Sequence, residues 1–122
     1  MFNYYIYRTY FNAKHSFNGD ITKIHGHSFT VVTYIGMKDS KEDIPFFKLE
    51  AIISSFIDQY RGRYLNELPE FEGCGNTLET IGDYFYEKLR KQLMKSGMEL
   101  YQLDISENPL CVYQVSDRML LP

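Results

Sequence analysis

Cysteine is scarce in this sequence, and its scarcity argues against two classes of small protein. Only Cys74 and Cys111 occur among the 122 residues. Two cysteines cannot supply the dense disulfide framework of a small secreted domain, and these two do not form a paired Cys-x-x-Cys metal motif. We therefore expect reduced thiols, and any metal site has to be built from other side chains.

Positive charge and long apolar runs are also lacking. The chain has 13 Lys and Arg against 16 Asp and Glu, a formal net charge of −3. Nucleic-acid binding normally requires clustered Lys and Arg, so nucleic acid is not an expected partner. No apolar run approaches the roughly 20 residues of a membrane-spanning helix, and the first residues contain no signal-peptide core. These absences predict one soluble domain over residues 1–122, located in the cytoplasm and without membrane contact.

Aromatic and β-branched residues, by contrast, are abundant in four short segments that predict strands. A turn signal at Asn18-Gly19-Asp20 lies between the first two segments, and Glu107-Asn108-Pro109 lies between the last two. The pattern therefore predicts two antiparallel hairpins. The four segments are Phe2–Ala13, His27–Gly36, Leu100–Ile105 and Cys111–Val115.

Between the hairpins, helical periodicity predicts two amphipathic helices. The second helix should begin near Asn76, an N-cap residue with Glu79 three positions later, and should stop at Ser96-Gly97. The order is ββααββ, an α+β fold in which a four-stranded antiparallel sheet carries two helices on one face. The apolar positions are Leu49, Ile52, Ile53, Phe56, Ile57 and Tyr60 in the first helix, and Leu78, Ile81, Phe85, Leu89 and Leu93 in the second.

All three histidines of the chain lie between positions 15 and 27. In an extended strand, His25 and His27 point to the same face, so both imidazoles can reach one ion. His15 stands just past the end of the partner strand and can complete a three-imidazole zinc site with one open position, the arrangement of a catalytic zinc. The alternative is that each histidine is an ordinary polar residue at a strand end.

Two sequence motifs around these histidines resemble signatures of a known family. Phe-Asn-Ala-Lys-His at 11–15 and His-Gly-His-Ser-Phe at 25–29 are similar to the Phe-x-Ala-x-His and His-Gly-His motifs of the 6-pyruvoyltetrahydropterin synthase and 6-carboxytetrahydropterin synthase family. The resemblance continues through Tyr64-Leu65-Asn66, Asn76–Glu79 and Ser106-Glu107. It therefore spans nearly the whole chain.

The resemblance implies the tunnelling fold (T-fold), zinc bound by His15, His25 and His27, and trimeric barrels stacked in pairs into a hexamer. It also implies that Glu107 binds the ring of a pterin. The residues support that role, because a carboxylate can accept hydrogen bonds from a ring N–H and the exocyclic amine together. A solvent-exposed Glu beside a turn is the alternative. Thr77 is a further candidate for a substrate contact.

The sequence departs from the family where protons are transferred. Catalytic members carry a Cys four residues before His-Gly-His and an Asp-His pair before the Tyr-Leu-Asn match. This sequence has Ile21 at the first position and Tyr60–Arg63 at the second. Asp20 and Cys74 are substitute catalytic candidates. The sequence favours a turn residue after Gly19 as the explanation of Asp20, and an ordinary loop thiol explains Cys74 at least as well as a catalytic role. The arginines of the Tyr60–Arg63 segment are candidates for an anionic tail or a solvated surface pair.

Two functions follow from these patterns. The first is a zinc-dependent lyase of the 6-pyruvoyl- or 6-carboxytetrahydropterin synthase type, acting on a dihydropterin such as dihydroneopterin triphosphate in queuosine-type or tetrahydrobiopterin-type biosynthesis. The alternative is a non-catalytic family member that binds zinc and a pterin or purine. In both cases we expect a homo-oligomer, a trimer or a hexamer, because an open sheet leaves two edges with unpaired backbone groups.

Overall fold

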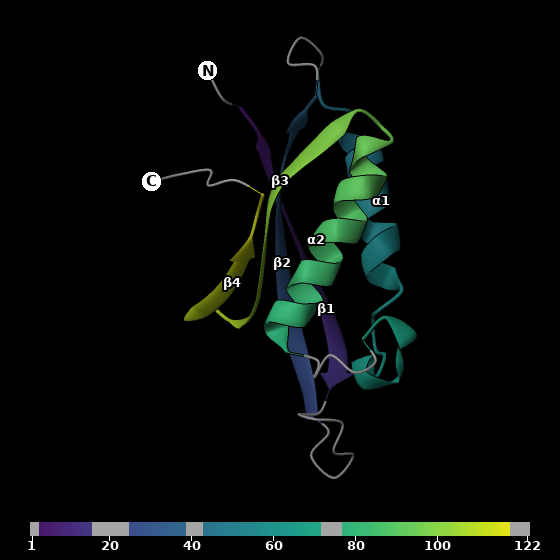
Figure 1. Cartoon of the computed structure of the whole chain (residues 1–122), viewed down its shortest axis with the longest axis vertical. Coiled ribbons are helices and arrows are strands. Elements are labelled where there is room, and N and C mark those ends of the chain that lie inside the picture. The colour runs from purple at the N-terminus through teal and green to yellow at the C-terminus, as the bar shows by residue number, and fades with distance from the viewer. Residues whose placement is uncertain (1–2, 16–24, 39–42, 72–76, 118–122) are drawn as a thin grey trace.

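The computed structural model describes residues 3–15, 25–38, 43–71 and 77–117, with the side chains of residues 15 and 25 excepted. Its strands form one antiparallel sheet in the order β1-β2-β3-β4. Two helices cover one side of that sheet, as Figure 1 shows. The predicted ββααββ order is confirmed. The elements are β1 Tyr5–His15, β2 His25–Met37, α1 Phe46–Asp58, η3 Leu65–Glu67, η4 Pro69–Phe71, α2 Leu78–Met94, β3 Met98–Asn108 and β4 Cys111–Val115.

The core lies between the sheet and the helices, because strand alternation and helical periodicity both turn apolar side chains toward this layer. Phe11 of β1 and Phe29 of β2 stack with their ring centroids 4.9 Å apart. Leu103 and Ile105 continue the apolar layer on β3, and both are fully buried. The helix residues fully or almost fully buried against it are Leu49, Ile53, Phe56 and Ile57 of α1 and Ile81, Phe85, Leu89 and Leu93 of α2.

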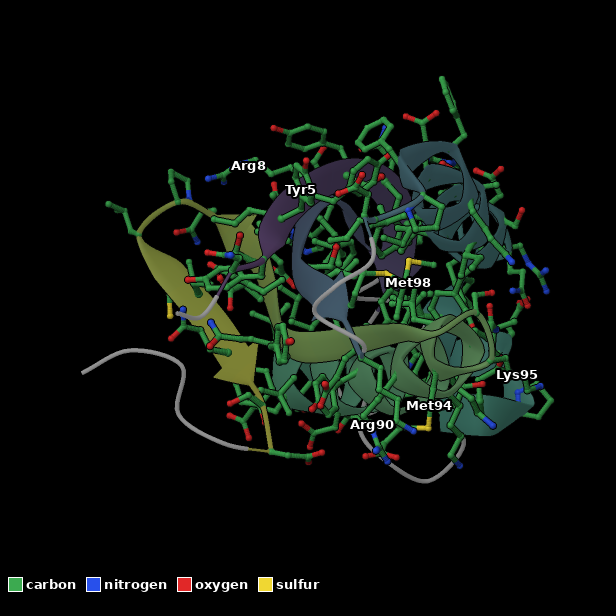
Figure 2. The ribbon with its side chains drawn as sticks, turned by 90° about the horizontal axis from the view of Figure 1, so that it is seen from above. Tyr5, Arg8, Arg90, Met94, Lys95 and Met98 are labelled. Atoms are coloured by element: carbon green, nitrogen blue, oxygen red, sulfur yellow. The ribbon has the colours of Figure 1, made fainter. Side chains whose placement is uncertain are left out.

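Because the helices cover one face of the sheet, the other face forms the opposite side of the molecule. In Figure 2, Tyr5 and Arg8 of β1 lie on the other side of the molecule from Arg90 and Met94 of α2. The face of the sheet away from the helices is not uniformly exposed, since Asp104 is 6% exposed on it. The Tyr34 hydroxyl donates to Asp104 Oδ2 at 2.7 Å, and Gln102 Nε2 donates to Asp104 Oδ1 at 2.7 Å.

Three sequence-based details are wrong, and each error is a short displacement along the chain. Thr77, not Asn76, is the N-cap of α2, because Thr77 has extended backbone angles and its hydroxyl accepts from the Thr80 amide at 3.2 Å. His15 ends β1 rather than following it. Glu107 lies inside β3, and the turn falls at Pro109-Leu110.

The C-terminus of α2 is followed by a glycine in the left-handed conformation. Gly97 follows α2 with a φ of +77°, the left-handed conformation expected just past a helix C-terminus. Within the described parts of the chain, neither helix is long and apolar enough to cross a membrane.

Candidate functional site

The register of the first hairpin brings the histidine positions together. His15 of β1 pairs directly with His25 of β2, and His27 lies two residues further along β2. Directly opposed residues of antiparallel strands share a face, as do residues i and i+2 of one strand. Positions 15, 25 and 27 therefore share the face of the sheet that carries Phe11 and Phe29.

His27 is the histidine whose side chain the structure describes, and it contacts Glu107. Nδ1 of His27 lies 3.4 Å from Oε2 of Glu107, and each side chain is 27% exposed. Nε2 of the same imidazole is buried. The ring centroid is 6.2 Å from that of Phe29, which places the imidazole at the end of the aromatic core layer.

Glu107 lies at an irregularity in the sheet, on the face that alternation along β3 shares with Leu103 and Ile105. Ser106 pairs with Val112 and Asn108 pairs with Cys111, so Glu107 is an extra residue of β3 relative to β4. Such a bulge breaks the regular ladder and can redirect a side chain. The carboxylate of Glu107 thus lies at this bulge, beside the last rungs of the sheet, where the histidine positions lie.

The donor set at these positions suits zinc. Three neutral imidazoles bind zinc in tetrahedral sites that leave a fourth position for water or substrate. The structure describes only one of the three imidazoles, and among the described side chains no group of three His, Cys, Asp or Glu residues is placed to hold a metal ion. The fit of the site therefore depends on the shared face of positions 15, 25 and 27 and on the buried Nε2 of His27.

The segment Arg61–Tyr64, which we call the edge segment, holds the site end of β1. The Gly62 amide donates to the Asn12 carbonyl at 2.6 Å, and the Lys14 amide donates to the Arg63 carbonyl at 2.9 Å. Lys14 also forms a parallel bridge with Tyr64. Gly62 has a φ of +70°, which the chain needs to turn from α1 onto β1 and which favours glycine.

Arg61 of the edge segment has a structural task. Its Nη1 donates to the Tyr10 carbonyl at 2.6 Å, and its Nε donates to Asp58 Oδ1 at 2.6 Å. The guanidinium therefore binds the neighbouring helix end and the edge of β1. This arrangement favours the surface-pair interpretation of Arg61 over a contact with an anionic tail.

An open depression of about 350 Å³ lies at the same end of the hairpin. This volume is within the range of small-molecule sites, roughly 300 to 1,000 Å³. Its lining combines His27 with residues that alternate along both strands, so it draws on both faces of the β1–β2 pair. The lining residues are Asn12, Ala13, Lys14, Gly26, His27, Ser28 and Gly62.

Three of these lining residues were not singled out from the sequence. Asn12, Lys14 and Ser28 alternate with the motif residues, and the Ser28 hydroxyl donates to Asn12 Oδ1 at 2.7 Å. Alternation alone assigns them to the face opposite His27. In the sequence, only their position within the two histidine motifs suggested that they belong to the site. That position does not show that the depression extends across both faces.

The remaining candidates are less closely connected to this site. Thr77 caps α2, and its Oγ1 lies 3.0 Å from Oγ1 of Thr80. A ligand contact from Thr77 therefore stays a prediction. Asp20, Ile21 and Cys74 lie outside the described residues. Cys111 is an exposed free thiol on β4.

Comparison with known proteins gives a family and a fold. The family model described as 6-pyruvoyl tetrahydropterin synthase matches residues 5–118. The solved structure of Caenorhabditis elegans 6-pyruvoyl tetrahydropterin synthase superposes with a TM-score of 0.79 at 20% identity, over 95% of this chain and 96% of that one. The Plasmodium falciparum 6-pyruvoyl tetrahydropterin synthase gives 0.66 at 16% identity, over 96% and 98% of the two chains.

An uncharacterized protein from Wolinella succinogenes has the same fold, with a TM-score of 0.65 at 15% identity over 95% of this chain and 99% of that one. A search of curated protein sequences gives no significant match. At these identities the structural matches establish the T-fold, and the family model covers nearly the whole chain.

Proposed function

The chain belongs to the 6-pyruvoyl tetrahydropterin synthase family, and from this premise we propose that it is a zinc-dependent lyase of the 6-pyruvoyl- or 6-carboxytetrahydropterin synthase type. Its substrate is a dihydropterin such as dihydroneopterin triphosphate. The chain works as one domain in the cytoplasm and assembles with copies of itself. The observation that carries the proposal is the shared face of His15, His25 and His27, with Glu107 in contact with His27.

Glu107 binds the substrate ring in this proposal. An ionised carboxylate is an acceptor-only group with two oxygens, which matches the adjacent N–H and amine donors of a pterin. The contact of 3.4 Å between Glu107 and His27 supports this role, because a ring held by the carboxylate lies next to a proposed metal ligand. The depression beside His27 gives the substrate side chain space at the same end of the sheet.

His15, His25 and His27 hold the zinc. When bound, a zinc ion with an open position would polarise a hydroxyl or carbonyl oxygen on the substrate side chain. The described side chains lining the depression orient and enclose the substrate. For proton transfer the sequence provides two candidates, Asp20 and Cys74, and assigns the role to neither of them.

A second candidate function is pterin binding without turnover, and one observation favours it. The edge segment occupies the place where the family resemblance puts an Asp-His pair, and it binds β1 through backbone hydrogen bonds and the Arg61 side chain. Gly62 has no side chain, and Arg is too basic to act as a general base at neutral pH. This part of the chain therefore has a structural role where the resemblance implies a catalytic one.

Zinc content tests the metal site. The purified protein should contain about one zinc per chain, as a three-imidazole site dictates. His27→Ala should lose this zinc, and the matched control Asn3→Ala, at an exposed position outside the site, should retain it. An unchanged zinc content in the His27 variant, measured by elemental analysis, would remove the basis of the site.

Turnover and affinity measured side by side distinguish the two functions. General acid-base groups typically contribute about 10² to 10⁴ in rate each, so an enzyme with a relocated base should lose turnover in Asp20→Asn or Cys74→Ser while retaining pterin affinity. Tight binding without turnover of any tested pterin would reject the lyase and favour the binding protein.

A further inference from the structure

The contact between Glu107 and His27 links the proposed ring site to the proposed metal site. Oε2 of Glu107 faces Nδ1 of His27 at 3.4 Å, and Nε2 of the same imidazole is buried. The bulge between Ser106 and Asn108 makes Glu107 the extra residue of β3 relative to β4. A bulge beside a functional side chain is a common way to direct it.

The chemistry of the two groups determines where the imidazole proton lies. An ionised carboxylate accepts hydrogen bonds and donates none. If Nδ1 carried a lone pair, two acceptors would face each other at this distance. Nδ1 therefore carries the proton, and in the neutral imidazole the lone pair is on Nε2, the nitrogen that remains to bind a metal.

We propose that Glu107 is a positioning residue for His27, which holds the imidazole in the Nδ1–H tautomer with Nε2 presented to the zinc. This inference rests on the proposed function and adds to it a second task for Glu107. One carboxylate then orients a metal ligand and binds the substrate ring, because two oxygens offer enough acceptor sites for both partners. Carboxylates that orient a metal-binding histidine typically change metal affinity by about 10- to 100-fold when they are removed.

The tautomer can be measured without any metal. In the full-length, zinc-free protein with ¹⁵N-labelled histidine, at a pH where the imidazoles are neutral, NMR should show His27 as the Nδ1–H tautomer. The His27 signal is assigned as the one that is missing from the spectrum of His27→Ala. Glu107→Ala should move the population toward the Nε2–H tautomer, and the control Glu50→Ala, at an exposed position on α1, should not.

Zinc affinity gives a second readout, with zinc alone titrated against a competing chelator. Glu107→Ala should weaken zinc binding by about 10- to 100-fold, and Glu50→Ala should leave it unchanged. An Nε2–H tautomer of His27 in the wild-type protein would overturn the proposal, as would a Glu107→Ala variant with unaltered zinc affinity. The wild-type tautomer tests the proposal even if the variant does not fold.

These outcomes are separable from the proposed function. A wild-type protein that binds no pterin but has the Nδ1–H tautomer and a Glu107-dependent zinc affinity supports the positioning role and rejects the dihydropterin substrate. A protein that turns over a dihydropterin but has the Nε2–H tautomer at His27 keeps the lyase and rejects the positioning role.

Discussion

At the scale of single residues, Glu107 combines a partly buried carboxylate with a position at the end of the core layer. Replacing it by Gln keeps the size of the side chain and removes the charge. Glu107→Gln should weaken binding of a pterin such as neopterin by about 1.5 to 3 kcal/mol, the scale of hydrogen bonds to a charged group. Isothermal calorimetry measures this loss, with Glu50→Gln as the control, and equal affinities in wild type and Glu107→Gln would reject the ring contact.

The environment of Tyr34 predicts how the free energy of unfolding changes at high pH. Burial, followed by the hydrogen bond to Asp104 and the charge of that carboxylate, raises the pKa of Tyr34 from 10.0 to about 12. A raised pKa in the folded state means that the contribution of Tyr34 to the free energy of unfolding is complete below pH 10. This contribution is lost as the pH rises through about 12.

Urea denaturation across this pH range tests that prediction. The free energy of unfolding should fall between pH 10 and pH 12, and the fall should be smaller in Tyr34→Phe because the variant has no phenol to ionise at this position. Tyr5→Phe removes a hydroxyl from a residue that is 57% exposed and serves as the matched control. Identical pH profiles for wild type and Tyr34→Phe would contradict the assignment.

At the scale of elements, α2 approaches the sheet closely at Gly82. A Cβ atom at this position would lie 2.8 Å from the Tyr113 ring and 2.9 Å from Cγ2 of Ile105. Gly82→Ala should destabilise the protein by up to about 2 kcal/mol, because overpacking costs about 1 to 3 kcal/mol and the better helix propensity of Ala offsets about 1. Chemical denaturation measures the change, with the exposed α2 variant Lys91→Ala as the control, and a more stable Gly82→Ala variant would contradict this packing.

Most of the element order is predictable from the sequence, because it depends on local periodicity. Ile81, Phe85 and Leu89 recur at helical spacing, and the structure buries all three. The boundary at the start of α2 was misplaced by one residue, since adjacent Asn76 and Thr77 are both good N-caps and only the structure shows which residue has the extended backbone.

Two features of the site depend on how segments pair with one another, and the periodicity of the sequence does not predict them. The bulge at Glu107 is defined only by the pairing of β3 with β4. In the sequence, the edge segment was notable only for lacking the Asp-His pair of catalytic family members. The structure shows that Gly62 and Arg63 form backbone hydrogen bonds with β1. The histidine spacing was informative from the start, because a period of two along a strand determines which positions share a face.

At the scale of the whole molecule, the sheet has two edge strands with exposed apolar side chains. Tyr5 and Tyr10 of β1 are 57% and 62% exposed, and Val112 of β4 is 46% exposed. Within the described residues, β4 pairs only with the part of β3 from Leu103 to Asn108, so the beginning of β3 also presents an edge. Unpaired edges with apolar side chains are surfaces that natural proteins normally cover.

We therefore expect association of several copies through these edges, as a trimer or as a hexamer of two trimers. Light scattering at micromolar concentration should give a mass of three or six times 14.4 kDa. Val112→Lys, which adds a charge at the β4 edge, should shift the distribution toward smaller species, whereas Glu50→Lys on α1 should not. A wild-type monomer at that concentration would contradict the prediction.

The edge segment also determines where along β1 a neighbouring copy can attach. It occupies the outer backbone groups of Asn12 and Lys14, and Arg61 occupies the Tyr10 carbonyl. By the same alternation, the outward-facing backbone groups before this point belong to Ile6 and Arg8. A partner strand pairing with β1 would therefore stop before the histidine end of the hairpin, so that the proposed contacts between copies and the proposed metal ligands would use opposite ends of one strand.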